Sequence, residues 1–238
     1  MPAAAVAALV ISLSAVTTDN GAAAAADVEH DFKVRWPAGT PRGVVVFLHG
    51  VSSDPFRPSE EGEGIEALAV AATKRGLVAV FPIGYQVCDF EKPREYQRCW
   101  LIDQIDDEMK DLTKIVRTLE KKAGVPFQKR QLIGFSNGGF LVAGALQRGL
   151  LDDFTRVGIL SAGPVGDRVP APEKPLPKVF IEVGKDDKWQ RGSTRQLASM
   201  LTSTTVFDES IHFREVPGGH VFDRERASRF LDWFWSDG

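Results

Sequence analysis

The feature of this sequence that most constrains its fold is a series of short apolar runs separated by segments with helical periodicity. The runs are GVVVFLHG (43–50), LVAVFP (77–82), RQLIGF (130–135), RVGIL (156–160) and KVFIEV (178–183). Runs of this length with few polar residues are typical of parallel strands that are buried on both faces. Strands that alternate with helices indicate an α/β fold, with a mostly parallel central sheet and helices on both faces.

The segments around these runs complete the expected order of elements. VEHDFKVRW (28–36) alternates Phe32, Val34 and Trp36 with polar residues, which predicts a half-buried edge strand. The clearest helix covers 103–122, with Asp103 as its predicted N-cap and Gly124 past its end. Further helices are expected at 65–75, from Asn137, at 191–201 and before Trp235, and a further strand at IHFREV (211–216).

Length and charge limit the organisation and the partners of the chain. The sequence has 238 residues, of which 43% are hydrophobic, enough for one substantial core. It has no internal repeat, and its proline-rich connection from Pro164 to Pro177 is too short to divide it into two domains. The net charge of -3 supplies no excess of cations for a phosphate backbone, so we do not expect nucleic acid as a partner.

The first 26 residues differ in composition from the rest. An uncharged apolar stretch from Ala3 to Val16 is followed by the small residues Ala22–Ala26, a pattern typical of a signal peptide and its cleavage region. The stretch is shorter than the roughly 20 apolar residues that a membrane-spanning helix needs. We therefore expect a secreted or periplasmic protein without stable membrane insertion, with residues 27–238 as its single domain. The alternative is an Ala-rich leader that is not a signal peptide.

The two cysteines, Cys88 and Cys99, lie in one segment between predicted elements. In an exported protein we expect them to form a disulfide that closes this segment. The alternative is a pair of unrelated reduced thiols. Neither cysteine belongs to a C-x-x-C pair, so metal binding by them is not expected.

The stretch Gly134-Phe135-Ser136-Asn137-Gly138 has the pattern G-x-S-x-G between a predicted strand and a predicted helix. In this context the glycines allow a tight turn that holds the serine hydroxyl above the edge of the sheet, as a nucleophile elbow does. The alternative is a glycine-rich turn that serves packing alone. We take Ser136 as the candidate nucleophile.

A serine nucleophile needs a base and an acid, and in this arrangement both follow it in the chain, the acid first. The strand KVFIEV runs into Asp186 and Asp187, and the strand IHFREV runs into a loop that ends at His220. We prefer Asp187 as the acid, with Asp186 as the alternative. His220 is the candidate base because the other histidines lie on or beside predicted strands; these are His30, His49 and His212.

A hydrolytic site of this type also needs backbone N–H groups that stabilise an oxyanion. One predicted donor is the N–H of Asn137, directly after the serine. The other is expected in the loop after FLHG, where Val51 or Ser52 is nearest. We expect His49 to hold that loop by hydrogen bonds rather than to act as a base.

Four motifs in order, FLHG, GFSNGG, GKDD and PGGH, make the chain from Val28 to Trp235 resemble the α/β-hydrolase superfamily. GFSNGG and the Cys99-Trp100 dipeptide resemble secreted polyhydroxybutyrate depolymerases and feruloyl esterases. GFSNGG with PGGH is also similar to small carboxylesterases and lysophospholipases. The sequence departs from the first group where Val51, not cysteine, follows HG. The resemblance implies a serine esterase that needs no cofactor and cleaves small or polymeric esters.

The connection between RVGIL and KVFIEV is too short for a separate lid domain. We therefore expect an open cleft for a short or extended ester, with Trp100 and Trp189 as candidate substrate-binding walls or else as packing residues. A peptidase or amidase on the same fold, and a noncatalytic binding protein, remain alternatives at this point.

Overall fold

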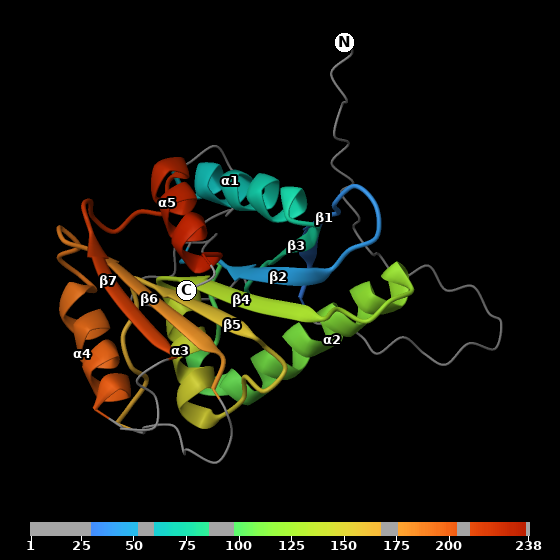
Figure 1. Cartoon of the computed structure of the whole chain (residues 1–238). Helices are drawn as coiled ribbons and strands as arrows, with labels where there is room; N and C mark the ends of the chain where they lie inside the picture. The colour runs from blue at the N-terminus through green and yellow to red at the C-terminus, as the bar shows by residue number, and fades with distance from the viewer. Residues whose placement is uncertain (1–29, 52–59, 86–97, 168–175, 204–209, 237–238) are drawn as a thin grey trace, which may run out of the picture.

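The computed structural model describes residues 30–51, 60–85, 98–167, 176–203 and 210–236. Its centre is a seven-stranded sheet in the order β1-β3-β2-β4-β5-β6-β7 (Figure 1). The edge strand β1 pairs antiparallel with β3, and every other pairing is parallel. The strands are β1 (Phe32–Arg35), β2 (Gly43–Leu48), β3 (Leu77–Pro82), β4 (Lys129–Phe135), β5 (Arg156–Leu160), β6 (Lys178–Gly184) and β7 (Ile211–Val216).

Helices cover both faces of this sheet, which confirms the expected fold class. Figure 1 shows α1 and α5 side by side on one face, and α2, α3 and α4 on the other. Their bounds are α1 (Glu60–Lys74), α2 (Ile105–Ala123), α3 (Asn137–Arg148), α4 (Arg191–Thr202) and α5 (Arg224–Phe234).

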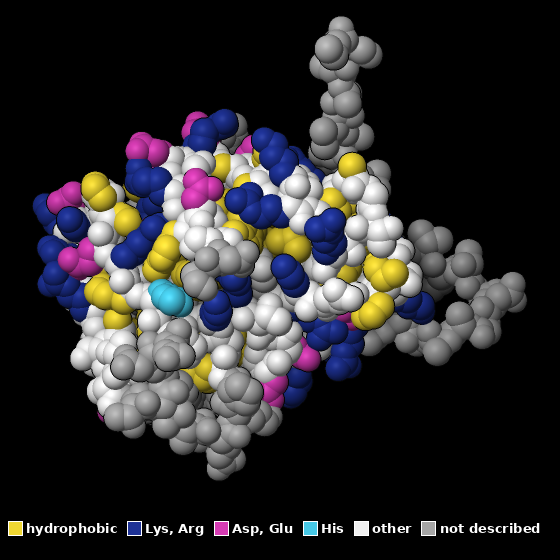
Figure 2. Space-filling view, in the orientation of Figure 1, with side chains coloured by type: hydrophobic (Ala, Val, Ile, Leu, Met, Phe, Trp, Pro, Cys, Tyr) yellow, Lys and Arg dark blue, Asp and Glu magenta, His cyan; other side chains and the backbone are white. Residues whose placement is uncertain are grey.

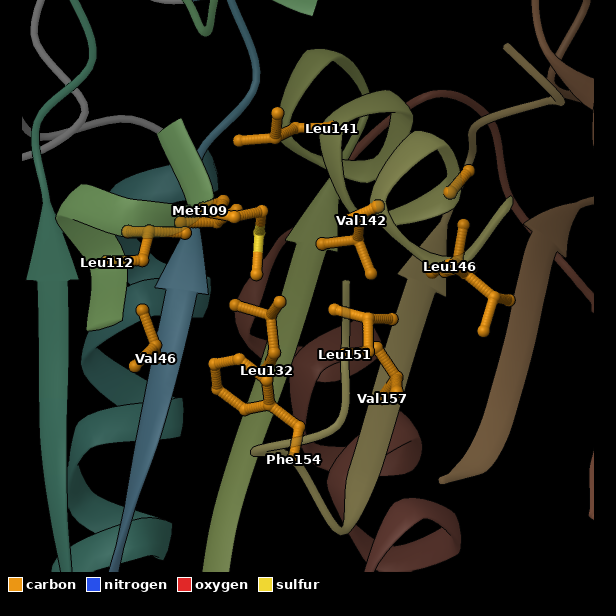
Figure 3. Packing of buried hydrophobic residues seen from close by; sticks show 14 of the residues in the cluster. Val46, Met109, Leu112, Leu132, Leu141, Val142, Leu146, Leu151, Phe154 and Val157 are labelled. Carbon is orange, nitrogen blue, oxygen red and sulfur yellow. The ribbon is translucent and has the colours of Figure 1, made fainter. Parts of the chain in front are cut away.

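The core has two halves because side chains alternate along each buried strand. In β2, Val44, Val46 and Leu48 face the half that packs under α2 and α3, while Val45 and Phe47 face the half under α1 and α5. Figure 3 shows the first half, where side chains of the helices lie against those of the strands; the labelled residues include Val46, Met109, Leu112, Leu132, Leu141, Val142 and Val157. Strands buried on both sides explain why the runs are almost wholly apolar.

The start of α2 corrects one expectation. Asp103 is not the N-cap, because a short 3₁₀ turn, Ile102–Gln104, precedes the helix, and Gln104 is the residue at the cap. The helix gains electrostatic stabilisation from three acidic residues in its first turn instead. At its other end, Gly124 adopts the left-handed conformation with φ of 69°, so the predicted end of the helix is confirmed.

Several sequence predictions lie outside the described residues. These are the signal peptide at residues 1–26, the Ser52 alternative for the oxyanion site, and Cys88, and with it the Cys88–Cys99 disulfide. They stay predictions. Among the described residues, no helix is long and apolar enough to cross a membrane.

Candidate active site

The turn between β4 and α3 has the geometry of a strained elbow. Ser136 has φ of 51° and ψ of -116°, a backbone conformation that residues with a side chain rarely adopt. The flanking glycines are required by close approach: a Cβ on Gly134 would lie 2.3 Å from the carbonyl oxygen of Gly138, and one on Gly138 would lie 2.3 Å from that of Leu48. The glycines therefore let β4, α3 and the end of β2 meet closely around Ser136.

The structure brings Ser136, His220 and Asp187 together in one chain of hydrogen bonds. The Oγ of Ser136 lies 2.8 Å from Nε2 of His220, and Nδ1 of His220 lies 2.8 Å from Oδ2 of Asp187. Asp187 is 1% exposed, whereas the alternative acid Asp186 is exposed. The three loops meet because parallel strands end at the same edge of the sheet, where sites of α/β proteins lie.

The surroundings of Asp187 favour its charged form. Burial tends to raise the pKa of this carboxyl, but hydrogen bonds from His220, the backbone N–H of Gln190 and the Ser161 hydroxyl outweigh burial, and the pKa lies below its ordinary value. The backbone N–H groups of Trp189 and Gln190 lie 3.1 and 2.9 Å from Oδ1. An ionised Asp187 accepts a hydrogen bond from Nδ1–H of His220, so Nε2 is the ring nitrogen that can accept a hydrogen bond from the Ser136 hydroxyl.

His49 holds two loops together. Its Nε2 accepts a hydrogen bond from the N–H of Gly84 at 3.0 Å, so the proton is on Nδ1, which donates to the carbonyl of Gly50. The ring therefore joins the segment after β2 to the segment after β3, the structural role expected of His49.

Trp100 differs from the expectation that it walls the cleft. Its side chain is 2% exposed and does not line the cavity beside Ser136. The indole Nε1 donates to the carbonyl of His49 at 2.9 Å, and the backbone N–H donates to Oδ1 of Asn137 at 2.7 Å. Trp100 is therefore a buried packing residue that connects the loop after β2 to the elbow. The sequence alone did not indicate whether the ring would form a wall of the cleft or pack in the interior.

The two predicted oxyanion donors, Val51 and Asn137, follow β2 and Ser136 respectively. Val51 lines the same cavity as Ser136 and His220, and Asn137 is the first residue of α3. Among the hydrogen bonds of the described residues, neither backbone N–H has a protein acceptor. Both groups are therefore available to an incoming ligand.

The cavity next to Ser136 has a volume of about 430 Å³. Trp189 lines it, is 77% exposed, and contacts the His220 ring edge-on with 5.4 Å between ring centroids. The cavity is thus open to solvent beside Trp189. Sequence reasoning did not name several of its lining residues as site residues. Gly50 and Phe135 lie within the FLHG and GFSNGG motifs but were given no role, and the others belong to no motif: Glu61, Gln190, Val221 and Phe222.

Glu61, near the start of α1, brings a carboxyl group into this cavity. Burial raises its pKa from the ordinary value of 4.5 to about 7, although a hydrogen bond from the N–H of Gly50 at 2.8 Å acts in the opposite direction. The Gly50 bond ties Glu61 to the loop that carries Val51. The Glu61 carboxyl, which is hydrogen-bonded to this loop, therefore gains or loses its proton near neutral pH.

A larger cavity, of about 660 Å³, lies at the opposite edge of the sheet, where the strands begin. It is rich in cations and contains no serine or histidine; the cations are Arg42, Arg75, Lys129, Arg156 and Lys178. Lys and Arg side chains are also spread over the face seen in Figure 2. The smaller cavity is the candidate active site because it alone of the two holds the hydrogen-bonded serine and histidine. No group of three or more His, Cys, Asp or Glu in the described part of the chain is placed to hold a metal ion.

No protein-family model and no curated protein sequence matches this chain. Solved structures do resemble it. A carboxylesterase from Mesorhizobium loti has 18% sequence identity and a TM-score of 0.62 over 89% of this chain and 97% of the other. A feruloyl esterase module from Clostridium thermocellum in complex with sinapinate has 15% identity and a TM-score of 0.61 over 87% and 83% of the two chains. A poly(3-hydroxybutyrate) depolymerase from Bordetella parapertussis has 16% identity and a TM-score of 0.59 over 86% and 85%. The chain therefore has the α/β-hydrolase fold that its motifs predict.

Proposed function

We propose that this protein is a serine hydrolase that cleaves carboxylic esters through Ser136, His220 and Asp187. The observation that carries the proposal is the chain of two hydrogen bonds, each 2.8 Å long, that joins these side chains at a strained elbow. Structural packing alone does not require a serine with a positive φ that faces a cavity and a histidine oriented by a buried aspartate. The similar folds of a carboxylesterase and a feruloyl esterase agree with this reaction class.

The mechanism follows from the order in which Ser136, His220 and Asp187 are hydrogen-bonded. Ser136 Oγ attacks the ester carbonyl carbon while Nε2 of His220 takes its proton, and Asp187 stabilises the imidazolium through Nδ1–H. The N–H groups of Val51 and Asn137 bind the oxyanion of the tetrahedral intermediate. The intermediate collapses when His220 returns the proton to the departing alcohol, which leaves an acyl-enzyme. Water then attacks the acyl group by the same proton transfers and releases the acid.

The shape of the site favours short or extended esters. Residues 161–177 connect β5 to β6 and are too few for a separate lid domain. Trp189, Phe135 and Phe222 give the cavity aromatic walls that suit an aryl or flat acyl group. Esters are favoured over amides as substrates because an alcohol leaves more easily than an amine.

The test is turnover of short p-nitrophenyl esters, together with labelling by a fluorophosphonate probe. Ser136→Ala should abolish labelling and reduce kcat by about 10⁴-fold or more. Ser228→Ala, which changes an exposed serine on α5, is the matched control and should keep full activity. Amide analogues with the same acyl group decide between an esterase and a peptidase or amidase. A wild-type protein that neither labels nor turns over any ester would favour the noncatalytic alternative.

A further inference from the structure

Arg226 on α5 is almost fully buried, with 2% exposure, and all three guanidinium nitrogens form hydrogen bonds. Nε lies 3.0 Å from Oε1 of Glu182, a fully buried residue of β6. Nη2 lies 3.0 Å from Oγ of Ser161, at the end of β5. A buried guanidinium is costly unless it is paired and fully hydrogen-bonded, as it is here. None of these three residues lines the candidate active-site cavity.

The remaining nitrogen of Arg226 binds the loop that carries His220. Nη1 donates to the carbonyl of Gly219 at 3.1 Å and to the carbonyl of Val221 at 2.6 Å. These two residues are the immediate neighbours of His220 in the chain. One planar, rigid group thus holds the backbone on both sides of the histidine.

Arg226 also determines the direction of the Ser161 hydroxyl. Because Nη2 of Arg226 donates to Oγ of Ser161, the hydroxyl proton points to another acceptor. The Ser161 hydroxyl is one of the groups that hold the pKa of Asp187 below its ordinary value, and an ionised carboxylate only accepts, so Ser161 acts there as a donor. Ser161 is itself fully buried and has a positive φ of 51°, a backbone conformation that residues with a side chain rarely adopt.

We propose that Arg226 is a positioning residue for the active site: it holds the His220 loop directly and orients Asp187 through the Ser161 hydroxyl. The proposal rests on the function proposed above for Ser136, His220 and Asp187. Glu182 belongs to the same arrangement because its carboxylate pairs with Arg226 at 3.0 Å, and its other oxygen pairs with Arg214 at 2.6 Å. Misplacing a reacting group by about 1 Å costs on the order of 100-fold in rate.

The experiment compares Arg226→Lys, Arg226→Met and Ser161→Ala with wild type. The matched control is Arg229→Met, which removes a more exposed arginine from the same helix. We expect kcat for a short ester to fall about 10- to 100-fold in the Arg226 variants, with KM changed by about twofold or less, because no substrate contact is lost. Ser161→Ala should give a smaller fall in kcat, and Arg229→Met none.

A second readout does not depend on turnover. The proton resonance of the His220 Nδ1–H group in NMR spectra should shift in Ser161→Ala, because Asp187 loses a donor and becomes a stronger acceptor for Nδ1–H. Arg226→Met should also shift this resonance, because the backbone on both sides of His220 loses its donor. Loss of folding would abolish the resonance instead of shifting it.

The outcomes separate the two proposals. A shifted Nδ1–H resonance with reduced kcat supports the positioning role. If wild type is inactive but the resonance still shifts in the variants, the positioning role holds and the proposed function fails. If Ser161→Ala and Arg226→Lys both fold, keep kcat within about twofold of wild type and leave the Nδ1–H resonance unchanged, Arg226 has only a structural role.

Discussion

The side-chain oxygen of Asn137 accepts a hydrogen bond of 2.7 Å from the backbone N–H of Trp100, thirty-seven residues earlier in the chain. The residue after the candidate nucleophile therefore has two separate tasks. Its backbone N–H is a proposed donor to the oxyanion, and its side chain holds the segment that contains Trp100. The Trp100 indole in turn binds the carbonyl of His49, so the elbow and the loop before Val51 are fixed relative to each other.

Asn137→Ala should therefore destabilise the protein. It leaves the partly buried N–H of Trp100 without its acceptor, and we expect the free energy of unfolding to fall by about 1–3 kcal/mol. Urea denaturation measures the change. Asn137→Asp keeps an acceptor oxygen in the same place and serves as the control, so equal losses in both variants would contradict this account.

Gly138→Ala should be strongly destabilising because the added Cβ would lie 2.3 Å from the carbonyl oxygen of Leu48, which belongs to the central strand β2. We expect a loss of about 1–3 kcal/mol or more in the free energy of unfolding, since rigid backbone must move to make room. The matched control is Gly192→Ala on α4, where a Cβ would meet no atom within 4 Å. That variant should be neutral or gain about 0.5–1 kcal/mol. Thermal unfolding of both variants gives the comparison.

Trp189→Ala should separate binding from stability. The ring is 77% exposed, so its removal should change the free energy of unfolding by about 0.5 kcal/mol or less. KM for an aryl ester should rise more than KM for an acetate ester of a small alcohol, because the indole forms a wall of the cavity. Steady-state kinetics on the two substrates test this, and equal KM values in variant and wild type for both would remove Trp189 from the binding site.

The sequence predicts the fold well because each buried strand is an apolar run that stands out from the segments with helical periodicity around it. It also predicts which side chains meet, since parallel strands bring the residues after β2, β4, β6 and β7 to one edge. The preference for Asp187 over Asp186 agrees with the geometry, in which Asp187 is buried and bonded to His220.

What the sequence does not predict is the arrangement behind the site. Arg226 lies four residues before Phe230 and eight before Phe234, so helical spacing places it on the buried face of α5, but the spacing does not say which group it contacts there. Glu182 was a usable signal, because a carboxylate within an otherwise apolar strand is rarely left without a partner. The partner comes from a distant helix, which only the tertiary structure reveals. The N-cap at Asp103 was predicted wrongly for a different reason: Asp103 lies inside a short 3₁₀ turn that precedes the helix.

Glu61 makes the stability of the protein depend on pH. Its pKa is raised in the folded state from 4.5 to about 7, so the folded state favours the protonated form. This contribution is fully present below about pH 4.5 and is lost as the pH rises to about 7. Glu61→Gln keeps an oxygen for the Gly50 N–H but does not ionise.

The difference in the free energy of unfolding between Glu61→Gln and wild type should therefore grow with pH. We expect the variant to be about 1–3 kcal/mol more stable than wild type at pH 8, and close to wild type at pH 4.5, because one pKa unit corresponds to about 1.4 kcal/mol. Urea denaturation across this range measures both curves. Glu63→Gln, an exposed change on the same helix, is the control and should give a curve parallel to that of wild type. A parallel curve for Glu61→Gln would mean that the Glu61 carboxyl is solvated in the folded protein and ionises as it does in the unfolded chain.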